Sequence, residues 1–68
     1  MKAISGKRMC KVLEAKGWKL ARVTGSHHIF VTSGRNVRIS VPVRGSQDLK
    51  IGLQKAILSL AGIKEEEL

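Results

Sequence analysis

Apolar residues recur at helical spacing near both ends of the chain. Residues 6–16 carry an apolar stripe that is preceded by Ser5, a plausible N-cap, and followed by Gly17, a helix stop signal. A second helical stretch over residues 50–60 ends at Gly62. Each helix therefore has one apolar side that must pack against another layer. These sides consist of Met9, Val12 and Leu13 in the first helix, and of Leu53, Ile57, Leu58 and Leu60 in the second.

The middle of the chain alternates with the period of two that is typical of strands. Segments 18–23, 27–32 and 37–41 are predicted strands, joined by a turn at residues 24–26 and a hairpin loop at residues 33–36. The order helix–strand–strand–strand–helix predicts a two-layer α+β fold. It consists of a three-stranded antiparallel sheet with both helices on one face and the other face open. We expect the whole chain to form one domain, because 68 residues leave no room for a second.

Two adjacent histidines, His27 and His28, begin the second predicted strand. Successive side chains of a strand point to opposite faces, so only one imidazole can face the helices. A hairpin loop of two or four residues places His28 opposite Val41 on the core side and turns His27 outward. A three-residue loop with a bulge reverses the two. An exposed imidazole is a candidate general acid or base, although a histidine in a strand is more often a surface residue without chemistry.

The first predicted strand alternates only weakly. Regular alternation places Arg22 on the same face as Leu20 and Trp18. We predict that Trp18 is a core residue, because it directly follows a helix stop signal in a chain with a small core. One Trp and one Phe do not make the aromatic platform on which many single-strand binders stack bases.

Basic residues outnumber acidic ones by 13 to 5, which gives a net charge of +8. Such an excess indicates a polyanionic partner, and nucleic acid is the usual one. A membrane partner is disfavoured, because the cations are spread over the chain and no apolar run approaches the roughly 20 residues of a membrane span. The start of the chain lacks the apolar core of a signal peptide, and Cys10 has no second cysteine to pair with. These features predict a cytoplasmic protein.

Few kinds of catalytic chemistry fit the remaining polar residues. The chain has no Cys/His zinc spacing, no P-loop, and only Glu14 and Asp48 as acids before its C-terminal end. We therefore predict no metal and no small-molecule cofactor. One imidazole among Arg and Lys suffices for metal-free RNA cleavage. The imidazole moves a proton at the ribose 2′-OH or the leaving 5′ oxygen, and the cations stabilise the phosphorane.

Three stretches of the chain carry a family resemblance. They are Gly17-Trp18 with Arg22; Gly25-Ser26-His27-His28-Ile29-Phe30; and Val41-Pro42-Val43 followed by Leu49, Gly52, Ile57, Leu58, Gly62, Ile63 and the Glu-rich end. In these stretches the chain resembles the HicA-type (YcfA-like) toxins, the mRNA-cleaving partners in bacterial type II toxin–antitoxin systems. The Gly-Ser-His core of the second stretch is the most specific feature, and the resemblance spans nearly the whole chain.

The resemblance implies a double-stranded-RNA-binding-domain-like fold, which agrees with the predicted order of elements. It implies ribosome-independent endoribonuclease activity on mRNA, with the histidine of Gly-Ser-His, here His27, as the catalytic residue. It also implies a HicB-like antitoxin protein as partner. Many members have a His after Val-Pro-Val where this chain has Arg44, which can hold a phosphate but cannot shuttle a proton. The candidate RNA-binding residues are Lys7, Lys11, Arg22, Ser26, Arg38, Arg44 and Lys50.

Two other function classes remain open from the sequence. The first is a non-catalytic double-stranded RNA-binding module of the same fold. That module usually carries a Lys cluster at the start of its last helix, where this chain has only Lys50 and Lys55. The second is a structural or DNA-binding role, for which no recognition helix is evident.

Overall fold

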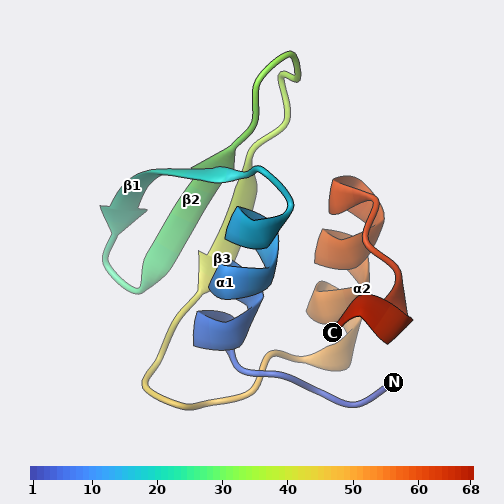
Figure 1. Cartoon of the computed structure of the whole chain (residues 1–68). Coiled ribbons are helices and arrows are strands. Elements are labelled where there is room, and N and C mark those ends of the chain that lie inside the picture. Colours follow the sequence, from blue (N-terminus) through green and yellow to red (C-terminus); the bar gives the residue numbers. More distant parts are fainter.

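Two helices cover one face of a three-stranded antiparallel sheet in the computed structural model, which describes residues 1–68 (Figure 1). The strands lie in the order β1-β2-β3. This arrangement confirms the predicted α+β fold class. No helix has the length and apolar character needed to cross a membrane. In chain order the elements are α1 (Gly6–Ala15), β1 (Lys19–Thr24), β2 (His27–Val31), β3 (Ile39–Pro42), α2 (Ile51–Ala61) and the 3₁₀ turn η1 (Glu65–Glu67).

Local signals begin and end the helices close to the predicted positions. The Ser5 hydroxyl caps α1 by accepting a hydrogen bond from the backbone N–H of Arg8 at 3.1 Å. Gly62 ends α2 with φ 68°, a left-handed conformation that glycine adopts without steric cost. The start of α2 has neither a side-chain cap nor an acidic residue in its first turn. Its first N–H groups therefore have no side-chain acceptor.

The register between β2 and β3 decides which side chains face the helices. Phe30 pairs with Ile39, and His28 pairs with Val41. The side chains of Phe30, Ile39 and Val41 are at most 1% exposed, and His28 is half-buried on the same side. His27 consequently points to the open face, which is the first of the two alternatives that the sequence left open. The rest of the core comes from the helices and the segments next to them: Met9, Leu13, Trp18, Leu49, Ile57, Leu58 and Ile63.

A bulge in β1 overturns one face assignment. The pairing of β1 with β2 shifts register between Leu20 and Arg22, so Ala21 is an extra residue. Arg22 pairs with Ile29, which faces the open side, whereas Leu20 pairs with a core residue of β2. The expectation that Arg22 shares a face with Leu20 and Trp18 is therefore wrong. A single extra residue moves every later side chain of the strand to the other face.

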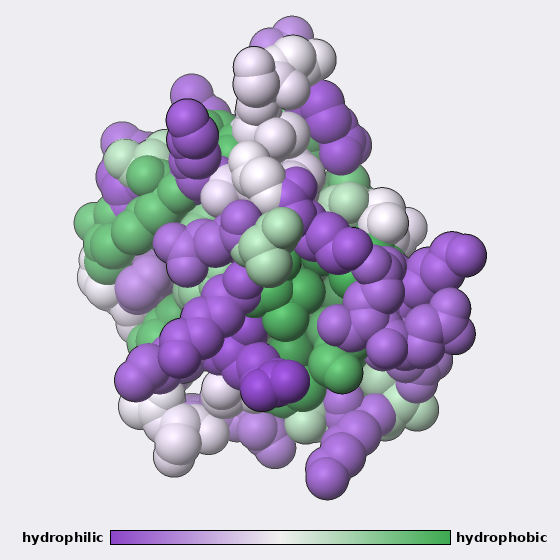
Figure 2. Space-filling model, in the orientation of Figure 1, coloured by the Kyte–Doolittle hydropathy of each residue, from purple (hydrophilic) through white to green (hydrophobic).

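The helix-covered side of the molecule is mostly polar, with apolar side chains gathered over β1 at its edge (Figure 2). Leu20 and Val23 of this strand are 43% and 51% exposed. Both face the helix layer, as their pairing with Phe30 and His28 shows. They remain exposed because β1 extends beyond α1 (Figure 1).

The connection between β2 and β3 is longer than the predicted hairpin loop and covers residues 32–38. Arg35 links this loop to the rest of the fold. Its guanidinium donates a hydrogen bond to the Leu60 carbonyl at 2.9 Å and lies 5.5 Å from the centroid of the Trp18 ring. The loop is thus tied to the end of α2 and to the core, and β3 begins only at Ile39. Trp18 is 4% exposed, which confirms its predicted core role.

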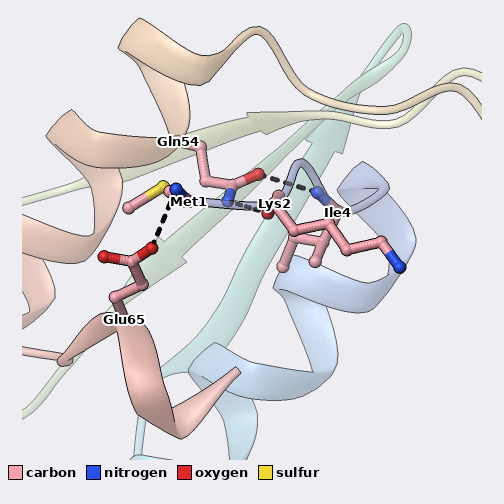
Figure 3. A network of polar contacts seen from close by, with 5 residues as sticks. All are labelled: Met1, Lys2, Ile4, Gln54 and Glu65. Carbon is pink, nitrogen blue, oxygen red and sulfur yellow. Dashed lines mark hydrogen bonds and ion pairs between the residues drawn. The ribbon is translucent and has the colours of Figure 1, made fainter.

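The buried side of α2 differs from the prediction. Leu53 and Leu60 are 38% and 46% exposed, whereas Gln54 is fully buried. The Gln54 Oε1 atom accepts a hydrogen bond from the backbone N–H of Ile4 at 2.8 Å, and its Nε2 donates to the Lys2 carbonyl at 2.9 Å (Figure 3). Since both polar ends are paired, the amide can be buried without a large desolvation cost.

Further contacts hold the two chain ends against the fold. The Met1 ammonium lies 3.1 Å from a carboxylate oxygen of Glu65 (Figure 3), and the Leu49 N–H donates to the Ile4 carbonyl at 2.8 Å. Lys16 forms an ion pair with Glu67. The hydrogen bond from Lys16 is the main cause that lowers the pKa of the Glu67 carboxyl. Glu65 and Lys16 are largely exposed, so we expect these ion pairs to add little to stability.

Replacing Gln54 with Leu tests the role of the buried amide. The variant leaves the Ile4 N–H and the Lys2 carbonyl without their partner, so we expect a loss of about 1–3 kcal/mol in the free energy of unfolding. Urea unfolding measures the loss, and faster hydrogen exchange at the Ile4 amide locates it. Lys55→Leu, on the exposed side of α2, is the matched control and should change stability by less than about 0.5 kcal/mol. A Gln54→Leu chain with parental stability and a protected Ile4 amide contradicts the assignment.

Candidate functional site

His27 is the first residue of β2, and its imidazole is exposed on the open face of the sheet. Its two paired neighbours are Thr24 on β1 and Pro42 on β3. Paired residues of adjacent strands point the same way, so these two flank the histidine. The hydroxyl oxygen of Ser40, a diagonal neighbour on β3, lies 3.2 Å from His27 Nδ1. The imidazole is therefore held at one nitrogen.

The backbone before His27 is anchored by a tight turn and a short hydrogen bond. Gly25 has φ 59°, a left-handed conformation that the turn requires. The Ser26 carbonyl accepts a hydrogen bond from the Val43 N–H at 2.7 Å, one position beyond the paired residues of β2 and β3. Ser26 thus contributes through its backbone, which fixes the position at which His27 enters the sheet.

The start of α1 packs directly on the end of β3. Gly6 is buried, and a Cβ atom built on it would overlap the carbonyl oxygen of Pro42. Only glycine permits so close an approach of backbone to backbone. The helix layer therefore supports Pro42, the residue directly opposite His27.

Arg44 and Lys50 line one hollow of about 260 Å³ beyond the end of β3. Pro42 forms part of its wall, so the hollow begins next to the residue that pairs with His27. The uncapped start of α2 follows directly after Lys50, and its N–H groups add partial positive charge. Asp48 also lines the hollow and offsets part of this charge. The arrangement favours binding of an anion in this hollow.

Arg22 and Arg38 are the other predicted RNA-binding residues near this face. The bulge in β1 places Arg22 on the open face, two residues before Thr24, the paired neighbour of His27. Arg38 is exposed and directly precedes β3, two residues before Ser40. The site thus has an arginine on each of the two chain segments that flank β2.

Lys7 and Lys11 are not brought to His27. Both are exposed on α1, which lies on the opposite side of the sheet. Lys11 instead lines a second hollow on the basic face of the helix, together with Arg8, Lys16 and Glu67. The Glu67 carboxylate offsets part of the positive charge there.

Burial raises the pKa of the Cys10 thiol, with a smaller contribution from the negative charge of Glu14. Cys10 is half-buried against the core. No three His, Cys, Asp or Glu side chains gather in a way that would hold a metal ion. The open face therefore offers an imidazole, a hydroxyl and guanidinium groups.

The fold and the site together define a small basic α+β protein with helices on one sheet face and an exposed histidine on the other. The family described as HicA toxin of bacterial toxin-antitoxin systems matches residues 6–63, from the first residue of α1 to the last core residue. The chain belongs to this family, and it is accordingly a toxin with an antitoxin partner. No curated protein gives a significant match to the chain.

Gly6→Ala tests whether α1 supports the site through its contact with Pro42. The added methyl group must displace the Pro42 carbonyl, so we expect a loss of about 1–3 kcal/mol in the free energy of unfolding. We also expect shifts in the NMR signals of His27 and Ser40. Gly52→Ala is the matched control, because Gly52 lies in α2 with nothing within 4 Å of an added Cβ. The contact has no structural importance if Gly6→Ala proves as stable as Gly52→Ala.

Proposed function

We propose that this toxin is an endoribonuclease that cleaves mRNA in the cytoplasm, with His27 as general acid or base and without a metal ion. One observation carries the proposal. In a HicA-family chain, the histidine of Gly25-Ser26-His27 is exposed on the open sheet face and held by Ser40, and its paired residue Pro42 lines a hollow together with Arg44. An open face accommodates a polymer, whereas a small metabolite usually needs an enclosed pocket.

The chemistry requires one proton transfer on each side of the phosphorus. His27 Nε2 takes the proton of a ribose 2′-OH, and the 2′ oxygen attacks the adjacent phosphorus. The P–O5′ bond breaks, which leaves a 2′,3′-cyclic phosphate on one fragment and, after protonation, a 5′-OH on the other. A positioned general base or acid contributes about 10²–10⁴-fold to such a rate.

The guanidinium groups around His27 suit the charge that develops on the phosphorane. Arg22 lies on the open face, and Arg44 lines the adjacent hollow. Positively charged donors aimed at developing negative charge stabilise the transition state more than the ground state.

Because His28 points to the helices and Arg44 cannot exchange protons at neutral pH, water completes the second proton transfer.

The antitoxin inhibits the toxin by covering the same face. The open face has no lid of its own, and its cations Arg22, Arg38 and Arg44 are exposed. An acidic antitoxin surface that packs over His27 would exclude RNA both sterically and electrostatically.

The basic surface on α1 favours a second candidate function. Arg8, Lys11 and Lys16 line their own hollow on the side of the sheet away from His27. Such a surface suits binding of duplex RNA through its phosphates, without cleavage. The experiments below distinguish the two functions, because only RNA cleavage requires His27.

His27→Ala separates catalysis from binding. We expect the variant to keep its fold and its RNA affinity while cleavage falls by about 10²–10⁴-fold, because the imidazole is exposed and carries the proton transfer. His28→Phe is the control and should retain cleavage, since His28 is half-buried opposite Val41. Single-turnover cleavage of a labelled RNA measures the rates, and circular dichroism checks the fold. Cleavage of RNA at the wild-type rate by a folded His27→Ala chain would contradict the mechanism.

The salt dependence of RNA binding tests the phosphate contacts. We expect log K for a His27→Ala chain to fall with log salt by about 0.7 for each phosphate contacted on a single strand. Arg44→Ala should reduce the size of this slope by about 0.7, because it removes one such contact. Lys2→Ala also removes one charge, but Lys2 does not line the hollow, so this change should leave the slope unchanged. Equal slopes for all three chains exclude Arg44 as a phosphate contact.

Competition between RNA and antitoxin tests whether both use the open face. We expect the antitoxin to displace a bound RNA from a His27→Ala chain, and Arg38→Glu to slow antitoxin association more than it speeds dissociation. A fluorescence titration measures the displacement, and surface plasmon resonance measures the rates. Simultaneous binding of both partners at full affinity rules out direct occlusion.

A further inference from the structure

The side chain of Ser40 makes a single hydrogen bond in the protein, to the imidazole of His27. Its hydroxyl oxygen lies 3.2 Å from Nδ1, and this is the only side-chain hydrogen bond of either residue. Nε2 of His27 bonds to no other protein group and is left on the exposed side of the ring. A hydrogen bond at Nδ1 fixes the orientation of an imidazole, and when Nδ1 is the donor the lone pair of Nε2 stays free.

We infer that Ser40 is a positioning residue for His27. When the Ser40 oxygen accepts a hydrogen bond from Nδ1–H, Nε2 keeps its lone pair and points away from the sheet, where it can take the proton of a ribose 2′-OH. After that transfer both ring nitrogens carry protons, and Nδ1–H still donates to Ser40. The serine therefore serves both protonation states of the histidine without moving. This inference rests on the proposed function and adds a second residue to its site.

The location of Ser40 argues against a purely structural role. Its side chain is exposed, so its hydroxyl satisfies no buried polar group. The neighbouring residues on β3, Ile39 and Val41, are buried and fix the strand on their own. Loss of the hydroxyl should therefore leave the fold unchanged. The register of β2 and β3 nevertheless places Ser40 diagonally opposite His27, where its short side chain reaches the ring.

The decisive comparison uses Ser40→Ala and Ser40→Thr in the full chain. Removing one hydrogen bond to the imidazole should slow single-turnover cleavage by roughly 2- to 10-fold, with an unchanged melting temperature. Thr keeps the hydroxyl and suits a strand, so Ser40→Thr should recover most of the wild-type rate. Nitrogen-15 NMR of the His27 ring measures which ring nitrogen carries the proton. This property would not change if Ser40 only supported the fold. Ser40→Ala should raise the fraction of the tautomer protonated at Nε2, and Ser40→Thr should not.

The remaining outcomes separate this inference from the proposed function. Adding Ser40→Ala to His27→Ala should slow cleavage no further, because the serine acts only through the histidine. The positioning role is wrong if the wild type cleaves RNA, His27→Ala does not, and Ser40→Ala matches the wild type in rate and tautomer. It is also wrong if Ser40→Thr loses as much activity as Ser40→Ala with the same tautomer change. If the wild-type chain and His27→Ala leave RNA equally intact, the proposed function itself fails, and the positioning role fails with it.

Discussion

The register between β2 and β3 is the constraint on which the site depends. Phe30 and Ile39 are buried as a pair against the helices, and Val41 is buried two residues further along β3. A shift of one residue would expose these side chains and bury polar ones in their place, at a cost of several kcal/mol. The core therefore fixes the register, and the register in turn places His27 and Ser40 together on the opposite face.

The cations of the protein are divided between the two faces by this architecture. Those on the side of His27 are Arg22, which the bulge in β1 turns to the open face, Arg38 directly before β3, and Arg44 and Lys50 between β3 and α2. The cations of α1 lie on the other side of the sheet. The net charge of +8 is therefore a property of the whole surface, whereas the proposed chemistry depends on a few groups. Different residues can accordingly attract RNA at long range and stabilise its reacting phosphate.

The sequence predicted the order of elements and the fold class, because hydrophobic periodicity reports directly on burial. It left open which histidine faces outward, because that depends on the register of β2 and β3. It also predicted the Ser5 cap and the buried Trp18, which depend on local signals. The face of Arg22 could not be predicted, because a bulge leaves no mark in the alternation of so weak a strand. The burial of Gln54 was equally hidden, since its partners lie about fifty residues away at the start of the chain. The contact between Ser40 and His27 depends on the register of β2 and β3, so only the structure reveals it.

The most direct test of the account is to map where RNA binds. NMR titration of the isotope-labelled wild-type chain with a 2′-O-methyl RNA, which cannot be cleaved through its 2′ oxygen, reports on both faces at once. The account predicts that the imidazole signals of His27 and the backbone signals of Ser40 and Arg44 shift together and saturate at one affinity. It is contradicted if only α1 signals such as those of Lys7 and Lys11 shift while the His27 ring remains unchanged.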